Sequence, residues 1–386
     1  MDPNSIPEKR ISYIYDEDLE AECNRLPSML NRASIVQDLI NSYGILNSNK
    51  ILVVRSTKAT ESDLKQFHSS SYVDFLKKTN SACDLEKFEK ESGEYGLDYD
   101  CPLLEKNFDF VSRIAGGTLT AATLLCRRIS RVAINWFGGW HHAQRDEAEG
   151  FCYVNDVVLG IQRLQKVFNR ILYIDLDVHH ANGVQNAFEL SKSILTLSFH
   201  KKEIGFYPGS GSLGEIGKST GSYYCLNVPF LSNICDKNYL LLFTNIFERV
   251  YESFNPFAIV IQCGGDILYG DHVGQCNISI DTMAKCIKQV LNCNIPSLIL
   301  GGGGYHLANT ARYWTYLTSI IAGVELDEDI PDSSEYFTLY APTYELKINT
   351  GNQKDDNTEE YISKLPPTTG DISQPLRLHL STSMLI

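Results

Sequence analysis

Two carboxylates and an imidazole alternate along residues 171–183, which read ILYIDLDVHHANG. The apolar stretch 171–174 is typical of a buried parallel strand. Because successive side chains of a strand point to opposite faces, Asp175, Asp177 and His179 are predicted to share one face. Burying three such groups is costly unless a positive charge pairs with them, and carboxylate and imidazole ligands suit zinc and its neighbours. The segment therefore predicts a divalent metal site, with the alternative that these side chains cap nearby backbone amides.

A third carboxylate would complete a catalytic metal site. Asp177, His179 and Asp266 would make a three-ligand site with one position left for water and substrate, which is typical of catalytic rather than structural zinc. Zinc bound there could polarise an amide carbonyl and activate its water. The residues thus favour hydrolysis of an amide.

Two further patterns offer groups for acid–base and oxyanion chemistry. His141 and His142 are adjacent, so they cannot easily bind one metal together, and they suit general acid/base roles with each ring held by a further acceptor. Tyr305 follows four glycines, which let its backbone approach the site and its phenol donate to a developing oxyanion. Taken singly, a histidine pair is most often surface or core filler, and GGGGY is most often a flexible turn. Only their joint placement at one edge of the sheet favours a functional site.

The elements that must position these residues are short strands alternating with helices. Such an alternation predicts a parallel sheet covered by helices on both faces. Strand patterns occur at 51–55, 132–136, 171–174, 194–198, 258–262 and 297–300. Helical patterns occur at 33–46, 108–128, 155–168, 282–291 and 309–323.

The residues that could do chemistry follow five of these strands. In open α/β sheets, ligand sites form at the carboxyl ends of the strands. We therefore expect one edge of the sheet to gather the segments that begin at Phe137, Asp175, Phe199, Cys263 and Gly301.

The bulk composition is that of an ordinary globular protein with one large α/β domain or two smaller ones. The chain has 386 residues, of which 43% are hydrophobic and 21% charged. Its net charge of −13 argues against direct nucleic-acid binding and is compatible with a basic peptide ligand. Eleven cysteines without a C-x-x-C pattern indicate reduced thiols in an intracellular compartment. No signal peptide or membrane span is predicted, so we expect a soluble protein.

Five long motifs resemble those of the zinc-dependent class I histone deacetylases. They read INWFGGWHHAQRDEAEGFCYVND, YIDLDVHHANGVQNAF, SFHKKEIGFYPGSG, GGDILYGD and LGGGGYHLANTARYWTYLT. Trp140 before the histidine pair and the short tail are most like the histone deacetylase 8 type. The resemblance implies a catalytic domain over 11–346, a polar extension over 1–10 and a polar appendage over 347–386.

The same resemblance implies a fold, a reaction and a place in the cell. The fold would be an arginase/deacetylase-like three-layer α/β fold, with a central parallel sheet of about eight strands and the active site at their carboxyl ends. The reaction would be hydrolysis of N-ε-acetyl-lysine in histone tails and other proteins, in the nucleus and the cytoplasm. Zn²⁺ would be the catalytic metal, although Fe²⁺ could fill the same ligands, and K⁺ would bind nearby.

The resemblance also assigns roles to individual residues. Asp177, His179 and Asp266 match the zinc ligands, His142 the general base and acid, and Tyr305 the residue that polarises the carbonyl. His141 matches the electrostatic partner, oriented by Asp175, and Asn182 the acceptor for His142. Substrate contacts are expected from Arg32, Asp100, Trp140, Gly150, Phe151, Tyr207, Val273 and Gly303. Potassium ligands are expected at Asp175, Asp177, His179, Ser198 and Phe199, and at Phe188, Ser191, Ile194 and Tyr224.

Three positions depart from the family's pattern. Asn182 stands where most class I members have aspartate, and losing that charge is predicted to lower the pKa of His142. Tyr207 replaces a tunnel phenylalanine, so its hydroxyl needs a partner or water at the rim. Val273 stands where methionine or leucine is usual, and with His272 it predicts a wider, more polar mouth with altered acyl selectivity.

Two other functions are compatible with parts of the sequence. An acetylpolyamine-type amidohydrolase would be favoured by an acidic residue near the tunnel mouth, which Val273 does not supply. An inactive acyl-lysine-binding scaffold would be favoured by loss of Tyr305, His142 or a metal ligand, and all of these are present. A binuclear manganese hydrolase would need further carboxylates near the histidine pair.

Overall fold

One parallel sheet runs through the computed structural model, which describes residues 11–82 and 84–365. The sheet has eight strands in the order β2-β1-β3-β8-β7-β4-β5-β6, and every neighbouring pair is parallel. The predicted parallel α/β architecture is therefore confirmed. The strands are β1 (Ile11–Ile14), β2 (Ile51–Val54), β3 (Val132–Asn135), β4 (Ile171–Asp175), β5 (Ile194–Lys201), β6 (Cys225–Phe230), β7 (Ala258–Gln262) and β8 (Ser297–Leu300).

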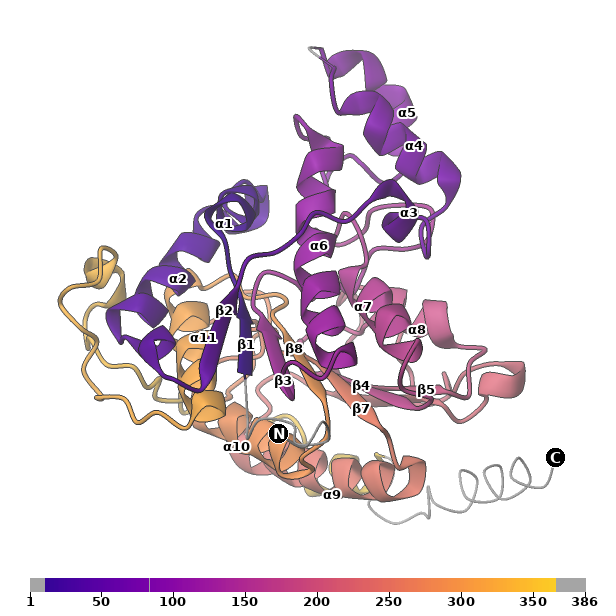
Figure 1. The fold of residues 1–386 in the computed structure, drawn as a ribbon. Coiled ribbons are helices and arrows are strands. Elements are labelled where there is room, and N and C mark those ends of the chain that lie inside the picture. The colour runs from indigo at the N-terminus through magenta and orange to yellow at the C-terminus, as the bar shows by residue number, and fades with distance from the viewer. Residues whose placement is uncertain (1–10, 83, 366–386) are drawn as a thin grey trace, which may run out of the picture.

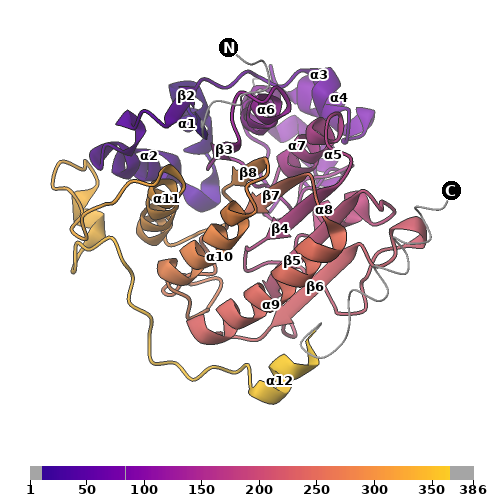
Figure 2. The ribbon, with the colours of Figure 1, turned by 60° about the horizontal axis from the view of Figure 1, so that its bottom comes forward.

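Helices cover both faces of the sheet (Figures 1 and 2). Helices α6 and α7 pack on one face, and α2, α9, α10 and α11 contribute to the buried cluster on the other. Their bounds, with those of the remaining helices, are α1 (Glu17–Cys23), α2 (Arg32–Ser42), α3 (Glu61–Leu64), α4 (Ser70–Thr79), α5 (Glu89–Gly93), α6 (Asn107–Cys126), α7 (Asp156–Gln165), α8 (Asn182–Phe188), α9 (Asp236–Phe254), α10 (Ile280–Asn292), α11 (Leu307–Ala322) and α12 (Glu359–Lys364).

Local sequence explains where α7 begins and which face it buries. The Asn155 side chain accepts a hydrogen bond from the Val158 amide at 3.0 Å, which satisfies a free N–H of the first turn. Apolar residues then recur with helical spacing at Val157, Ile161 and Leu164, and all are buried. The cap and the apolar face together fix the helix that follows the histidine pair.

Strand register sets the loops of the site side by side. Asp175 at the end of β4 pairs with Gln262 at the end of β7, and Asn135 of β3 pairs with Leu300 of β8. Strands β5 and β6 lie on one side of β4, and β7 and β8 on the other, so β4 lies where the strand order reverses. Such a switch point leaves a crevice at the carboxyl ends of the strands.

Part of the segment expected as a polar appendage packs on the folded body. Ile362 and Leu365 are buried, and Asn357 Oδ1 accepts a hydrogen bond from the Leu231 amide at 2.7 Å. Residues 366–386, like the predicted extension 1–10, lie outside the described residues.

Two bulk expectations can be compared with the described part of the chain. The ten cysteines within the described ranges form no disulfide. Among the described helices, none combines the length and apolar character needed to cross a bilayer.

Candidate active site

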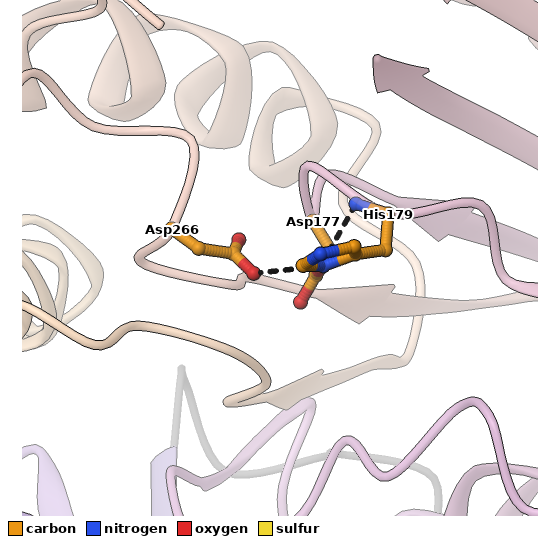
Figure 3. Close-up of side chains that lie close together, drawn as sticks. All are labelled: Asp177, His179 and Asp266. Carbon is orange, nitrogen blue, oxygen red and sulfur yellow. Dashed lines mark hydrogen bonds and ion pairs between the residues drawn. The ribbon is translucent and has the colours of Figure 1, made fainter. Parts of the chain in front are cut away.

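The three predicted metal ligands meet at the carboxyl edge of the sheet. Asp177 and His179 lie in the loop after β4, and Asp266 lies in the loop after β7 (Figure 3). Their ligand atoms all lie within 4.8 Å of one another. His179 Nδ1 is 3.0 Å from Asp177 Oδ1 and 3.1 Å from Asp266 Oδ2. All three side chains are buried, so the structure brings together the trio that the sequence singled out.

The electrostatics of this trio favour a bound cation. Burial, and then the charge of Asp177, raises the pKa of Asp266 to about 7. Burial alone would lower the pKa of His179, but its close contacts with the carboxylates of Asp177 and Asp266, and their charges, raise it to about 10. Asp266 Oδ2 receives no hydrogen bond from the described residues, and His179 Nδ1 lies 3.1 Å from it. Two buried carboxylates that draw positive charge fit a divalent metal ion.

The carboxylates also hold backbone amides, as the alternative interpretation proposed. Asp177 Oδ1 accepts from the His179 amide at 3.0 Å, and Asp266 Oδ1 accepts from the Val178 amide at 3.1 Å. Asp177 Oδ2 accepts from Gln262 Nε2 at 2.7 Å and from the Gly303 amide at 2.9 Å. Capping and metal binding are therefore compatible, because Asp266 Oδ2 is left for a ligand.

Two glycines make room for these carboxylates. A Cβ on Gly264 would lie 2.3 Å from Asp177 Oδ2, and one on Gly303 would lie 2.1 Å from Asp266 Oδ2. Neither contact is sterically possible, so the GGD and GGGG sequences are needed to keep the ligands in place. Gly303, predicted to contact substrate, packs against Asp266 and donates its backbone amide to Asp177 Oδ2.

The adjacent histidines have different partners and different charge. Asp175 is a pure acceptor, so His141 donates to Asp175 Oδ2 from Nδ1 at 2.7 Å. His142 Nδ1 lies 2.7 Å from Asn182 Oδ1, and the two Nε2 atoms are 3.0 Å apart. Burial opposes protonation of both rings, but the charges of Asp175 and Asp177 raise the pKa of His141 to about 9. Burial and the charge of His141 hold the pKa of His142 well below its usual range.

This difference in pKa leaves one imidazole of the pair charged and the other neutral. Pairs of titratable groups whose pKa values are driven apart are typical of acid–base sites. The neutral ring, His142, has a nitrogen that can accept a proton. The charged ring, His141, supplies a positive charge beside it.

Tyr305 is held at the site by a residue to which no role had been assigned. Asp271 Oδ2 accepts from the backbone amide of Tyr305 at 2.7 Å. Burial raises the pKa of the Tyr305 phenol far above its usual range, so the hydroxyl remains a donor. Arg32 contacts the same loop by donating a hydrogen bond to the Gly304 carbonyl at 3.0 Å. Its guanidinium lies over the Trp314 ring, 4.8 Å from the ring centre.

Four of the eight predicted substrate positions, Trp140, Gly150, Phe151 and Gly303, line one cavity together with the metal ligands Asp177 and His179. It is lined by Met29, Gly139, Trp140, His141, His142, Gly150, Phe151, Cys152, Asp177, His179, Gly302, Gly303 and Tyr305. Tyr207, with 36% of its surface exposed, packs edge-on against His142 with ring centres 4.9 Å apart. Asp100 is exposed and Val273 half-buried, and neither lines this cavity.

The predicted potassium residues form two groups around β5. Asp175 and Ser198 pair across β4 and β5, and Phe199 is the next residue of β5. In the second group, the Ser191 amide donates to the Phe188 carbonyl at 2.8 Å, close to Ile194 at the start of β5. The Tyr224 carbonyl accepts from the Thr196 amide at 2.9 Å.

His180 lies apart from the metal ligands. Its Nδ1 is 2.8 Å from Ser210 Oγ, and its Nε2 is 3.0 Å from Gln185 Oε1.

Sequence reasoning missed several residues that hold the site together. Asp156 accepts hydrogen bonds from the Gly139 and Trp140 amides at 3.0 and 2.8 Å, so it fixes the loop before the histidine pair. Gln262 and Asp271 hold Asp177 and the Tyr305 loop, as described above. Asp271 belongs to the GGDILYGD motif, which is the only signal that could have drawn attention to it.

An all-parallel sheet with a buried Asp–His–Asp trio beside paired histidines defines a hydrolase of the arginase/deacetylase fold class. Comparison with known proteins narrows this class. The histone deacetylase domain matches residues 26–321, which is most of the chain. The chain therefore belongs to the histone deacetylase family and is a hydrolase of the protein deacetylase type.

Its relatives include animal and plant members of the family. It is 42% identical over 354 residues to histone deacetylase 8 of Xenopus tropicalis, covering 92% of this chain and 95% of the relative. It is 41% identical over 360 residues to histone deacetylase 8 of Danio rerio, covering 93% and 94%. Histone deacetylase 9 of Arabidopsis thaliana is 42% identical over 358 residues, covering 92% and 83%.

Proposed function

We propose that this chain hydrolyses N-ε-acetyl-lysine in histone tails and other proteins, using Zn²⁺ held by Asp177, His179 and Asp266. The observation that carries the proposal is the buried trio, of which Asp177 and His179 line one cavity with the histidine pair and Tyr305. When bound, the metal would supply a Lewis acid and a water of lowered pKa. Fe²⁺ suits the same ligands.

The protein's own groups would move the protons and stabilise charge. Neutral His142 takes a proton from the attacking water at Nε2 and later returns it to the leaving lysine amine. His141, charged and held by Asp175, stabilises the negative charge that develops beside it. The Tyr305 hydroxyl donates to the oxyanion that forms on the acetyl carbonyl.

The remaining predicted roles complete the proposal. The exposed carboxylate of Asp100 would grip the substrate backbone, and Arg32 would lie on the route of acetate release. K⁺ would bind at the two groups around β5. The substrates would be nuclear and cytoplasmic acetyl-lysine proteins, including those of chromatin.

A peptide library tests the proposed function. Metal-reconstituted protein is incubated with acetyl-lysine peptides, acetylated polyamines and unmodified controls, and released acetate is measured. We expect turnover of acetyl-lysine peptides. Preference for acetylpolyamines would favour the small-amine alternative, and binding of peptides without turnover would favour an acyl-lysine-binding scaffold.

The acid limb of the pH–rate profile should report the pKa of His142. This residue must be neutral to accept a proton, so kcat/KM falls as the pH drops through its pKa. In Asn182→Asp a carboxylate would replace the amide 2.7 Å from His142 Nδ1, which raises that pKa and moves the acid limb to higher pH. An acid limb at the same pH in both proteins would contradict this assignment. The pH–rate profiles of the wild type and Asn182→Asp are also compared with that of Glu149→Gln, because Glu149 Oε1 lies 2.7 Å from Asn182 Nδ2.

Acyl selectivity should depend on the residues at the mouth. The double variant Tyr207→Phe/Val273→Met removes one hydroxyl and enlarges a half-buried side chain. We expect it to lose several-fold more activity on butyryl-lysine than on acetyl-lysine peptides, because the larger side chain narrows the mouth; a several-fold ratio corresponds to about 1 kcal/mol. Equal loss on both peptides would show that these residues do not set acyl selectivity.

A further inference from the structure

One carboxylate joins two of the positions at which this chain departs from its family. Glu149 Oε1 accepts hydrogen bonds from Asn182 Nδ2 and from the Tyr207 hydroxyl, each at 2.7 Å. Its other oxygen, Oε2, accepts from Gln144 Nε2 at 2.7 Å. Because two separate departures converge on one oxygen atom, we propose that Glu149 is a positioning residue for the acid–base chemistry of His142. This inference rests on the proposed function and adds a residue to it.

The first step of the argument is the orientation of the Asn182 amide. A carboxylate only accepts hydrogen bonds, so the amide must turn its NH₂ group toward Glu149 and its oxygen toward His142. His142 Nδ1 must then carry the proton, and Nε2 keeps its lone pair. Without Glu149 the amide could turn round and hold the opposite tautomer. An asparagine that selects the wrong histidine tautomer is known to cost orders of magnitude in kcat in serine proteases.

The second step is the position of the Tyr207 ring. With its hydroxyl bound to Glu149, the ring meets His142 at a centre distance of 4.9 Å and His179 at 6.0 Å, edge-on to both. A Cβ on Gly150 would lie 2.6 Å from the Tyr207 hydroxyl oxygen and 2.8 Å from His142 Cδ2. The ring therefore fills the space beside the general base, and Glu149 fixes it there.

The third step is the backbone that carries Glu149. Glu149 and Cys152 exchange backbone hydrogen bonds at 3.0 and 2.9 Å, which closes a tight turn. Gly150 and Phe151 form its tip with φ of 53° and 66°, and both line the cavity. Glu149 thus ties the tunnel-wall turn to the start of α8 and to the loop that carries Tyr207.

Glu149→Ala tests the proposal against Glu147→Ala, which removes an exposed glutamate from the same loop. We expect Glu149→Ala to lower kcat about 10- to 100-fold, as is usual for residues that orient a catalytic group, with KM little changed. Zinc affinity and Tm should stay close to those of Glu147→Ala. A kcat equal to that of Glu147→Ala would overturn the proposal.

The same Glu149→Ala substitution made in the Asn182→Asp protein distinguishes a positioning role from a general structural role. In Asn182→Asp, the new carboxylate would lie 2.7 Å from that of Glu149, and the two charges would repel each other. In this background Glu149 would therefore displace the side chain at position 182 instead of holding it. Glu149→Ala should then raise kcat in the Asn182→Asp protein while lowering it in the wild type. Loss of kcat in both backgrounds would show a merely structural role and would overturn the proposal.

Imidazole ¹⁵N shifts test the tautomer without turnover. In zinc-loaded protein, the His142 signals, assigned by their absence in His142→Ala, should show a protonated Nδ1. They should move toward the other tautomer in Glu149→Ala. If no acetyl-lysine peptide is turned over, the proposed function fails while this spectrum still decides the role of Glu149. An unchanged spectrum would overturn it.

Discussion

Asp266→Asn is expected to abolish acetate release and to weaken zinc binding by at least about 100-fold, since even residues that only orient metal ligands cost 10- to 100-fold. The substitution keeps the size of the side chain and removes the charge of Oδ2, the oxygen left without a hydrogen bond from the described residues. Metal content and competitive chelator titration measure the affinity, and acetate release measures the activity.

The metal-free form of the same variant gives a second readout. Burial and the charge of Asp177 raise the pKa of Asp266 to about 7, against about 3.9 in an unfolded chain. A carboxyl group with a raised folded-state pKa destabilises the fold as the pH rises from the unfolded value to the folded one. Metal-free Asp266→Asn should therefore lose less stability than metal-free wild type between about pH 4 and pH 7.

Exposed Asp332→Asn is the matched control for charge. It should bind zinc and release acetate like the wild type. If Asp266→Asn bound zinc as tightly as this control, Asp266 would not be a ligand and the metal site would have to be reassigned.

His142→Ala should retain zinc and lose about 10²- to 10⁴-fold in kcat, the usual contribution of a positioned general base. Its side chain is buried, and its low pKa, caused first by burial and then by the charge of His141, keeps it neutral and able to accept a proton. Single-turnover acetate release measures the chemical step, and zinc content shows that the site is intact.

The matched control for this second variant is His272→Ala. His272 is exposed, with its ring centre 6.2 Å from that of Tyr305, so it lies near the site without touching the histidine pair. We expect a modest effect on kcat. Equal losses in the two variants would mean that His142 has no special part in proton transfer.

Much of the fold could be predicted because its strands carry their own signals. The apolar runs that became β4, β7 and β8 are bounded by glycine or polar residues, and the metal ligands follow β4 and β7. Two strands were missed for physical reasons. β1 follows a polar stretch and its apolar run is interrupted by Ser12, and β6 contains Pro229, which is tolerated because β6 is an edge strand.

Part of the candidate site could likewise be predicted from the sequence, and part could not. Asp177 and His179 are close in sequence, and Asp266 follows a strand whose end meets theirs, so local pattern and strand order place them together. Glu149, Gln262 and Asp271 act through contacts that no local pattern encodes. The hydrogen bond between Glu149 and Asn182 depends on how two loops meet, so only the folded structure shows that the departure at Asn182 has a partner.

A zinc titration of the metal-free protein tests the central claim most directly. Bound zinc and acetate release from an acetyl-lysine peptide are measured in the same samples, with Asp266→Asn beside the wild type. Our account predicts that activity rises in proportion to bound zinc, saturates at one ion per chain and stays absent in Asp266→Asn. Acetate release before zinc is added, or full zinc occupancy without acetate release from any acetyl-lysine peptide, would contradict it.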